Sequence, residues 1–170
     1  MRSGDVKAAT EIWRTDPATL RDVALDREAV EARLAVSTGL ERVWILCLLE
    51  RADEAIIEGS RLLSDAEDRF RPLLVLAQAY QRRYSWHEAA RLHEEALCMA
   101  RTRSREAMVR LQIGKRLFDE ARYRDAAAEF EWAGDLYRSA SQREHLVEQC
   151  REACDRAQEL QRQVRSGFLL

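Results

Sequence analysis

Two histidine–glutamate pairs lie six residues apart in the stretch YSWHEAARLHEEAL, residues 84–97. The pairs are His87-Glu88 and His93-Glu94. Such pairs serve zinc proteases when a second histidine stands four residues after the first, but Arg91 and Leu97 occupy those places. A separation of six residues also puts the two imidazoles on different faces of a helix. We therefore interpret His87 as a surface residue and His93 as a packing residue.

A second candidate for metal chemistry lies near the end of the chain, where Cys150 and Cys154 are one helical turn apart and His145 is close in sequence. One helix by itself lacks the converging ligands that zinc requires. The same stretch also carries small and apolar residues at spacings of four and three, which is typical of a helix-packing seam. The seam consists of Leu146, Cys150, Ala153, Ala157, Leu160 and Val164. We favour the seam and expect no metal, no cofactor and no enzymatic activity.

Composition predicts an all-α protein. The 170 residues are 46% hydrophobic and 34% charged, with only six glycines and two prolines. The net charge is −2, and acids and bases alternate without a basic stripe or an acidic tail, so we expect neither nucleic acid nor a membrane surface as a partner. The longest apolar run, residues 43–49, is too short to span a bilayer, and the four scattered cysteines suit a reducing compartment. These features predict a cytoplasmic protein, and the excess of arginine over lysine suggests a bacterial source.

Helix start signals are frequent. Ser or Thr stands three residues before Glu in Thr38–Glu41, Ser85–Glu88 and Ser141–Glu144, which is the pattern of a capping box. Asp16-Pro17 places a capping acid before a proline at a first helical position. No stretch alternates with a period of two, so no strand is expected. The predicted elements are N-terminal helices near 5–14, 17–24 and 27–37, three helix pairs, and a terminal helix near 142–165.

Three segments share a central alanine: Ala55 in ADEAIIEGSRLL, Ala89 in WHEAARLHEEAL and Ala126 in YRDAAAEFEWAG, spaced by 34 and 37 residues. The pattern resembles the tetratricopeptide repeat over about residues 36–138. In the middle repeat the matching residues are Leu73, Leu76, Ala77, Tyr80, Ala89, His93 and Ala96. In the next repeat they are Arg110, Ile113, Gly114, Leu117, Ala126, Phe130 and Ala133. The first repeat keeps Leu46, Ala55 and Gly59 but has Arg42 where leucine is usual.

The resemblance implies one all-α domain, a short α-solenoid of antiparallel helix pairs in the form of a tetratricopeptide-like superhelix. Its parts are N-terminal helices over residues 1–37, three helix pairs over 38–138, and a capping helix with a tail over 139–170. Small residues at the alanine positions allow close helix approach, and a solenoid end needs the polar outer face that the last helix supplies.

The same resemblance implies a non-enzymatic scaffold that binds a protein or peptide, as an extended segment or a helix, in its concave groove. The groove positions carried over from the family are Arg71, Leu74, Gln78, Gln81, Arg82, Met108, Leu111, Lys115, Phe118 and Asp119. Trp44 falls on the groove face of the first repeat, where its ring is either covered by the N-terminal helices or offered to a partner, and we favour the first. The family's carboxylate clamp uses asparagine, which this chain lacks.

Two other functions remain open. The chain could be a chaperone for a secreted bacterial protein, because those chaperones are similar in size and repeat number. It could also be a self-assembling structural protein that forms a homodimer through its terminal helix.

Overall fold

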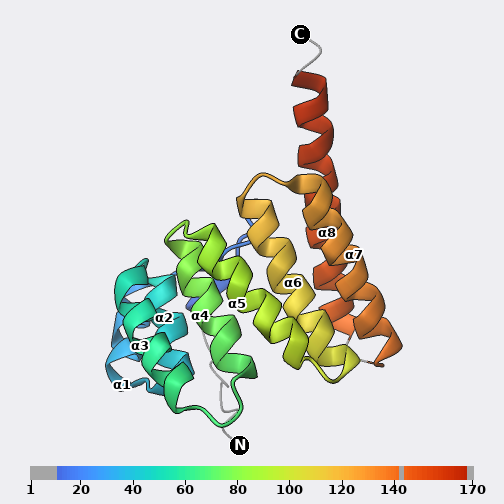
Figure 1. Ribbon diagram of the computed structural model, residues 1–170. Helices are drawn as coiled ribbons and strands as arrows, with labels where there is room; N and C mark the ends of the chain where they lie inside the picture. Colours follow the sequence, from blue (N-terminus) through green and yellow to red (C-terminus); the bar gives the residue numbers. More distant parts are fainter. Residues whose placement is uncertain (1–10, 142–143, 168–170) are drawn as a thin grey trace, which may run out of the picture.

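The computed structural model describes residues 11–141 and 144–167, and most of these residues are helical (Figure 1). The elements are β1 (Trp13–Thr15), β2 (Asp22–Ala24), α1 (Arg27–Val36), α2 (Gly39–Leu48), α3 (Ala52–Asp65), α4 (Phe70–Arg82), α5 (Trp86–Met99), α6 (Arg103–Asp119), α7 (Tyr123–Ser139) and α8 (Glu144–Gly167). The prediction of a helical fold is therefore confirmed. Among these described helices, none combines the length and the apolar character that crossing a membrane requires.

From α1 to α8, each helix packs against the next helix in the chain (Figure 1). Helices α2, α4 and α6 also contact one another across the array, α2 with α4 and α4 with α6. We call these three helices the inner layer. The buried side chains form two clusters, one mainly between α1 and α5 and the other between α6 and α8.

The same turn joins α2 to α3, α4 to α5 and α6 to α7. Its central residue has a positive φ each time, and these residues are Glu50 (60°), Tyr84 (62°) and Ala121 (59°). The next residue donates its backbone N–H to a carbonyl five residues earlier, at 2.9 Å in every case. This is the bond that satisfies a free carbonyl at a helix C-terminus. The three turns are spaced by 34 and 37 residues, the spacing of the three alanines.

Small residues stand at buried positions where helices pack on one another. Ala55, Ala89 and Ala126 are all fully buried. A Cβ atom added at Gly114 of α6 would lie 2.5 Å from the ring of Phe130 in α7. Because real Cβ atoms do not approach a ring so closely, only glycine allows α6 and α7 their observed separation.

The prediction of helices at the N-terminus is wrong for the described residues before α1. Residues 13–15 and 22–24 form an antiparallel hairpin with Trp13 opposite Ala24, and the predicted helix at 17–24 does not form. Asp16 caps the hairpin turn instead of a helix, because its carboxylate accepts hydrogen bonds from the Ala18 N–H and the Thr19 hydroxyl. Strands of three residues are too short to display an alternating pattern. Residues 5–10 of the first predicted helix lie outside the described residues.

The predicted capping boxes locate helix starts but not the capping bonds. Thr38 and Ser85 stand at the N-cap positions of α2 and α5, and neither side chain caps its helix. Glu41 instead forms an ion pair with Arg33 of α1. The third box lies partly outside the described residues, and α8 extends to Gly167, two residues beyond the predicted end.

Candidate functional site

The inner layer carries an open cavity of about 290 Å³, which we call the inner cavity. It is lined by Leu40, Glu41, Trp44, Arg71, Leu74, Val75, Gln78, Met108 and Gln112. The lining follows helical spacing, because α4 contributes residues at i, i+3, i+4 and i+7 and α6 contributes residues at i and i+4. One face of each inner helix therefore builds the cavity.

The chemistry of the inner cavity suits a polypeptide segment. Five of its nine lining side chains are apolar, and two are the amides of Gln78 and Gln112, which both donate and accept hydrogen bonds. The charged members are Arg71 and Glu41, of opposite sign. Apolar surface with a few polar groups can anchor side chains while it fixes the orientation of a backbone.

The N-terminal hairpin occupies the part of the inner layer beside this cavity. Arg21 donates two hydrogen bonds from Nε, at 3.1 and 3.2 Å, and one from Nη2, at 3.0 Å, to the carboxylate of Asp119. Gln81 donates to the same carboxylate at 2.6 Å, and Arg82 donates to the backbone carbonyl of Asp22 at 2.6 Å. Side chains of α4 and α6 thus hold the hairpin, which is 60 residues from Arg82 and 98 residues from Asp119 in sequence.

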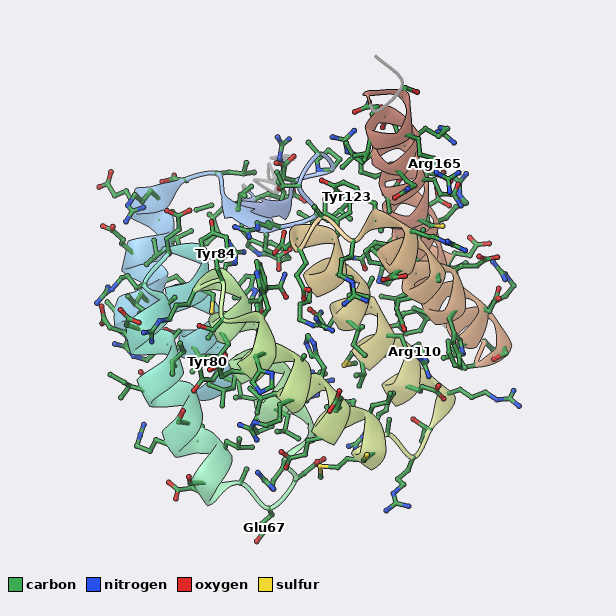
Figure 2. The ribbon with its side chains drawn as sticks, turned by 45° about the horizontal axis from the view of Figure 1, so that its top comes forward. Glu67, Tyr80, Tyr84, Arg110, Tyr123 and Arg165 are labelled. Atoms are coloured by element: carbon green, nitrogen blue, oxygen red, sulfur yellow. The ribbon has the colours of Figure 1, made fainter. Side chains whose placement is uncertain are left out.

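Leu20, between the two strands, anchors the hairpin. It has a positive φ of 59° and is buried in the same cluster as Leu111 and Phe118. Arg156 of α8 donates to the carbonyl of Ala18, so the hairpin reaches both α6 and α8. Figure 2 shows the hairpin, in blue, running from α1 toward the start of α7, where Tyr123 is labelled.

Trp44 links the hairpin to the inner cavity. Its ring meets Trp13 of β1 edge to face, with centroids 4.8 Å apart. Its Nε1 donates to the carboxylate of Asp22 at 3.4 Å. The hairpin, and not a set of N-terminal helices, therefore covers one side of Trp44, and the other side remains in the cavity wall.

The structure separates the ten predicted groove residues into three groups. Arg71, Leu74, Gln78 and Met108 line the inner cavity. Gln81, Arg82, Lys115 and Asp119 lie beside the hairpin. Leu111 and Phe118 are buried with Leu20.

Four cavity residues, Leu40, Glu41, Val75 and Gln112, were missed in the sequence. The tetratricopeptide resemblance indicated only some residues of each inner helix. These four residues lie on the same face of their helices as the residues that it indicated. Counting at i+3 and i+4 from Arg71 and Met108 would have found Val75 and Gln112.

The two histidines differ in environment as their sequence positions indicate. His87 is exposed at the start of α5. His93 is 1% exposed, and its Nδ1 has no hydrogen-bond partner among the described residues. Burial, with a smaller contribution from the positive charge of Arg116, lowers the pKa of His93 to about 3. The side chain is therefore neutral at physiological pH.

This burial predicts a pH-dependent stability. In the unfolded chain the pKa of His93 returns to its ordinary value of 6.5, while in the folded chain it is about 3. Between these values only the unfolded state binds the proton, so the free energy of unfolding decreases as the pH falls below 6.5. Between pH 7 and pH 5 the loss is about 2 kcal/mol. Urea denaturation of wild type and of His93→Phe at both pH values measures it.

In His93→Phe this pH dependence should disappear, because the ring cannot take up a proton. His87→Ala serves as the control and should retain it, since that side chain is exposed. A loss of equal size in wild type and His93→Phe would show that other groups cause it.

The three residues of the second metal candidate, Cys150, Cys154 and His145, lie in different environments. Cys150 is buried against α7, and burial raises the pKa of its thiol to about 11. Cys154 is half-buried, and its Sγ lies 3.6 Å from the carbonyl oxygen of Ala127. His145 is exposed. Among residues 11–141 and 144–167, no three His, Cys, Asp or Glu side chains group in a way that could hold a metal ion.

No protein-family model, curated protein or solved structure matches this chain.

Proposed function

We propose that this chain is a tetratricopeptide-like array that binds a segment of a partner protein in the inner cavity, without catalysis. The observation that carries the proposal is the inner cavity itself, with its apolar wall and its two amides on the layer of α2, α4 and α6. In the proposed solenoid this layer is the concave surface.

The backbone supports a repeating architecture. Three turns have a positive φ at the central residue and the same hydrogen bond, and a fully buried alanine follows five residues after each central residue. In a repeat array the same helix pair recurs, with its turn and its buried small residue at matching positions.

The hairpin supports recognition of an extended segment on this layer. Arg82 holds a backbone carbonyl and Trp44 holds a carboxylate of the hairpin. The same inner layer thus already binds one extended stretch of this chain. In the proposed complex a partner segment lies beside the hairpin, in the cavity that the hairpin leaves open.

The lining of the inner cavity supports a binding role over a catalytic one. Glu41 is its one carboxylate, and no histidine, cysteine or serine is among the nine residues. A nucleophile with an adjacent base is the usual requirement for covalent catalysis, and the lining does not provide this pair.

Selection of peptides from a display library on the full chain tests the proposal. We expect ligands with large apolar anchors. Met108→Glu should weaken them at least about tenfold, because it places a charge in the apolar wall. Isothermal titration calorimetry measures the dissociation constants, and circular dichroism checks folding.

Ile57→Glu is the matched control, since Ile57 is 73% exposed on α3 and lines no part of the inner cavity. It should bind the same peptides as wild type does. If selection yields no ligand, or if the selected peptides bind Met108→Glu as tightly as wild type, the inner cavity is not a protein-binding site.

A further inference from the structure

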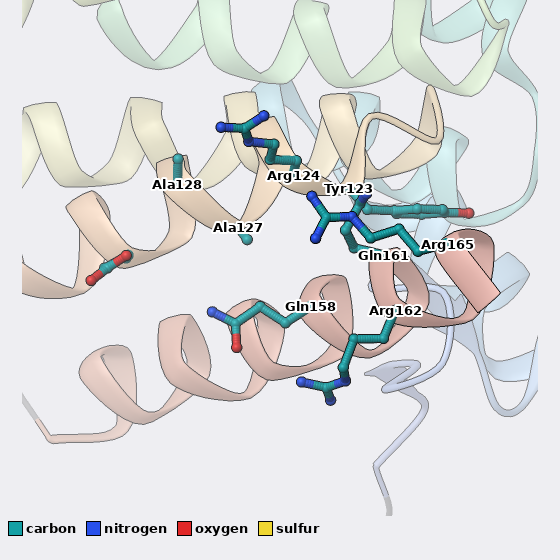
Figure 3. Close-up of a pocket in the computed structure, with 9 residues that line it drawn as sticks. Tyr123, Arg124, Ala127, Ala128, Gln158, Gln161, Arg162 and Arg165 are labelled. Carbon is teal, nitrogen blue, oxygen red and sulfur yellow. The ribbon is translucent and has the colours of Figure 1, made fainter.

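A second and larger cavity, of about 480 Å³, lies between the first half of α7 and the last half of α8 (Figure 3). We call it the α7–α8 cleft. It shares no lining residue with the inner cavity. A smaller cavity of about 260 Å³ adjoins it, and Glu131 and Gln158 line both. Together they follow α7 from Tyr123 to Arg138, a length of about 22 Å.

The α7–α8 cleft has an excess of positive charge. Arg124, Arg162 and Arg165 line it, and Glu131 is its one carboxylate. Beyond Glu159, the described part of α8 contains no acidic residue. A segment with several carboxylates is therefore the complementary occupant.

The three arginines have no ion pair or side-chain hydrogen bond with any described residue. Their neighbours in sequence differ. Arg122 pairs with Asp125, and Arg156 pairs with Glu159. In the adjoining cavity Arg138 is likewise paired, with Asp135. Since most arginines nearby are neutralised within the chain, the positive charge that is free for a ligand concentrates in the cleft.

The geometry leaves room for side chains between the arginines. Arg165 reaches from α8 toward Tyr123 and Arg124 of α7, and Gln158 points into the space between the helices (Figure 3). Opposite α8, the wall contains Ala127 and Ala128, whose methyl groups fill little of the volume. The last turns of α8 project beyond the other helices (Figure 1).

We propose that the α7–α8 cleft binds an acidic segment of a partner protein, with carboxylates at Arg124, Arg162 and Arg165. A guanidinium can donate two parallel hydrogen bonds to one carboxylate, which makes arginine better suited than lysine to this recognition. One exposed ion pair contributes little, but three cations around one cleft select strongly for charge and act together. This site is independent of the inner cavity, and its failure would leave the proposed function untouched.

Two synthetic 15-residue peptides test the proposal on the full chain: one of Glu, Ala and Leu, and its counterpart with Gln in place of Glu. We expect the acidic peptide to bind in calorimetry at 50 mM salt and the Gln peptide to bind at least about tenfold more weakly. Arg124→Glu with Arg165→Glu should abolish binding of the acidic peptide. Arg124→Gln with Arg165→Gln, which introduces no repulsion, should weaken it at least about tenfold.

Arg61→Glu is the matched control, because Arg61 is exposed on α3 and far in sequence from the cleft. It should bind the acidic peptide as wild type does. Circular dichroism should show every variant folded.

The alkylation rates of two natural cysteines report where the peptide binds. Cys154 is half-buried in the wall of the adjoining cavity, and Cys98 is exposed on α5. The acidic peptide should slow alkylation of Cys154 and leave that of Cys98 unchanged, as followed by mass spectrometry.

Three results would overturn the proposal. The first is equal binding of the acidic peptide to wild type and to the Arg124→Gln, Arg165→Gln variant. The second is binding of a single-stranded RNA oligonucleotide that depends on these arginines while the peptide does not bind. The third is sedimentation of wild type as a dimer that the same variant dissociates, since a second copy would then be the occupant.

Discussion

Replacement of Phe130 by alanine is expected to lower the free energy of unfolding by about 3–5 kcal/mol. The ring is fully buried in the cluster between α6 and α8, and it packs directly on the backbone of Gly114. Truncation removes its apolar contacts and leaves a cavity that rigid neighbouring helices cannot close. Chemical denaturation followed by circular dichroism measures the change.

Trp132→Ala is the matched control, two residues further along α7. This ring is 48% exposed, with the Arg110 guanidinium 3.2 Å from its centroid. Its removal should cost about 1 kcal/mol, mostly from the cation–π contact. A cost as large as that of Phe130→Ala would mean that α7 presents a different face to the core.

A double-mutant cycle with Gly114→Ala makes this prediction sharper. In wild type the added methyl group would lie 2.5 Å from the Phe130 ring, and overpacking of this kind costs about 1–3 kcal/mol. In the Phe130→Ala background the ring is absent, so Gly114→Ala should be neutral or stabilising. The two substitutions should therefore be strongly coupled. Additive effects would show that these two residues do not touch.

Replacement of Asp119 by alanine should lower the free energy of unfolding by about 2–3 kcal/mol and release the hairpin. The Asp119 side chain is 7% exposed and accepts hydrogen bonds from Arg21 and Gln81. Removing one partner of a buried pair leaves the other charge without compensation, and the partial exposure of Arg21, 24%, reduces this cost below that of a fully buried pair.

Release of the hairpin should change the tryptophan fluorescence of the protein, because Trp13 of β1 packs edge to face on Trp44. Asp135→Ala provides the comparison, since Asp135 pairs with Arg138 at 66% exposure on both sides. That substitution should leave both stability and fluorescence close to wild type. If Asp119→Ala behaves in the same way, the hairpin is held by contacts other than this ion pair.

Much of the helical part of the fold could be predicted from the sequence, because its determinants are local. Ala55, Ala89 and Ala126 recur with apolar residues at helical spacing, and the structure places each of them, fully buried, at the same point after the same turn. The environment of His93 followed from the spacing of the alanines, since the residue 37 positions further along the chain is the buried Phe130. Periodicity over ten or more residues is a strong signal of a helix and of its buried face.

The candidate sites could be predicted only in part. Four of the ten proposed groove residues line the inner cavity, and the family pattern could not indicate that the hairpin would take the places beside Gln81, Arg82 and Asp119. The cleft between α7 and α8 was not predicted. Arg124 is about 40 residues from Arg162 and Arg165 in sequence. Whether an arginine is paired becomes visible only when the helices are placed relative to one another.

The sequence alone determined the succession of helices from α1 to α8, and it also determined the small residues that allow α6 and α7 to pack closely. The reason is that backbone hydrogen bonding and apolar periodicity act between residues a few positions apart. Tertiary structure decided what the N-terminal segment does. Strands of three residues have almost no intrinsic stability, and the hairpin is held by Arg21 on Asp119, 98 residues away, and by Leu20 in a distant core. Contacts between residues so far apart in sequence depend on how α4, α6 and α8 are arranged in space. Local sequence patterns do not determine that arrangement.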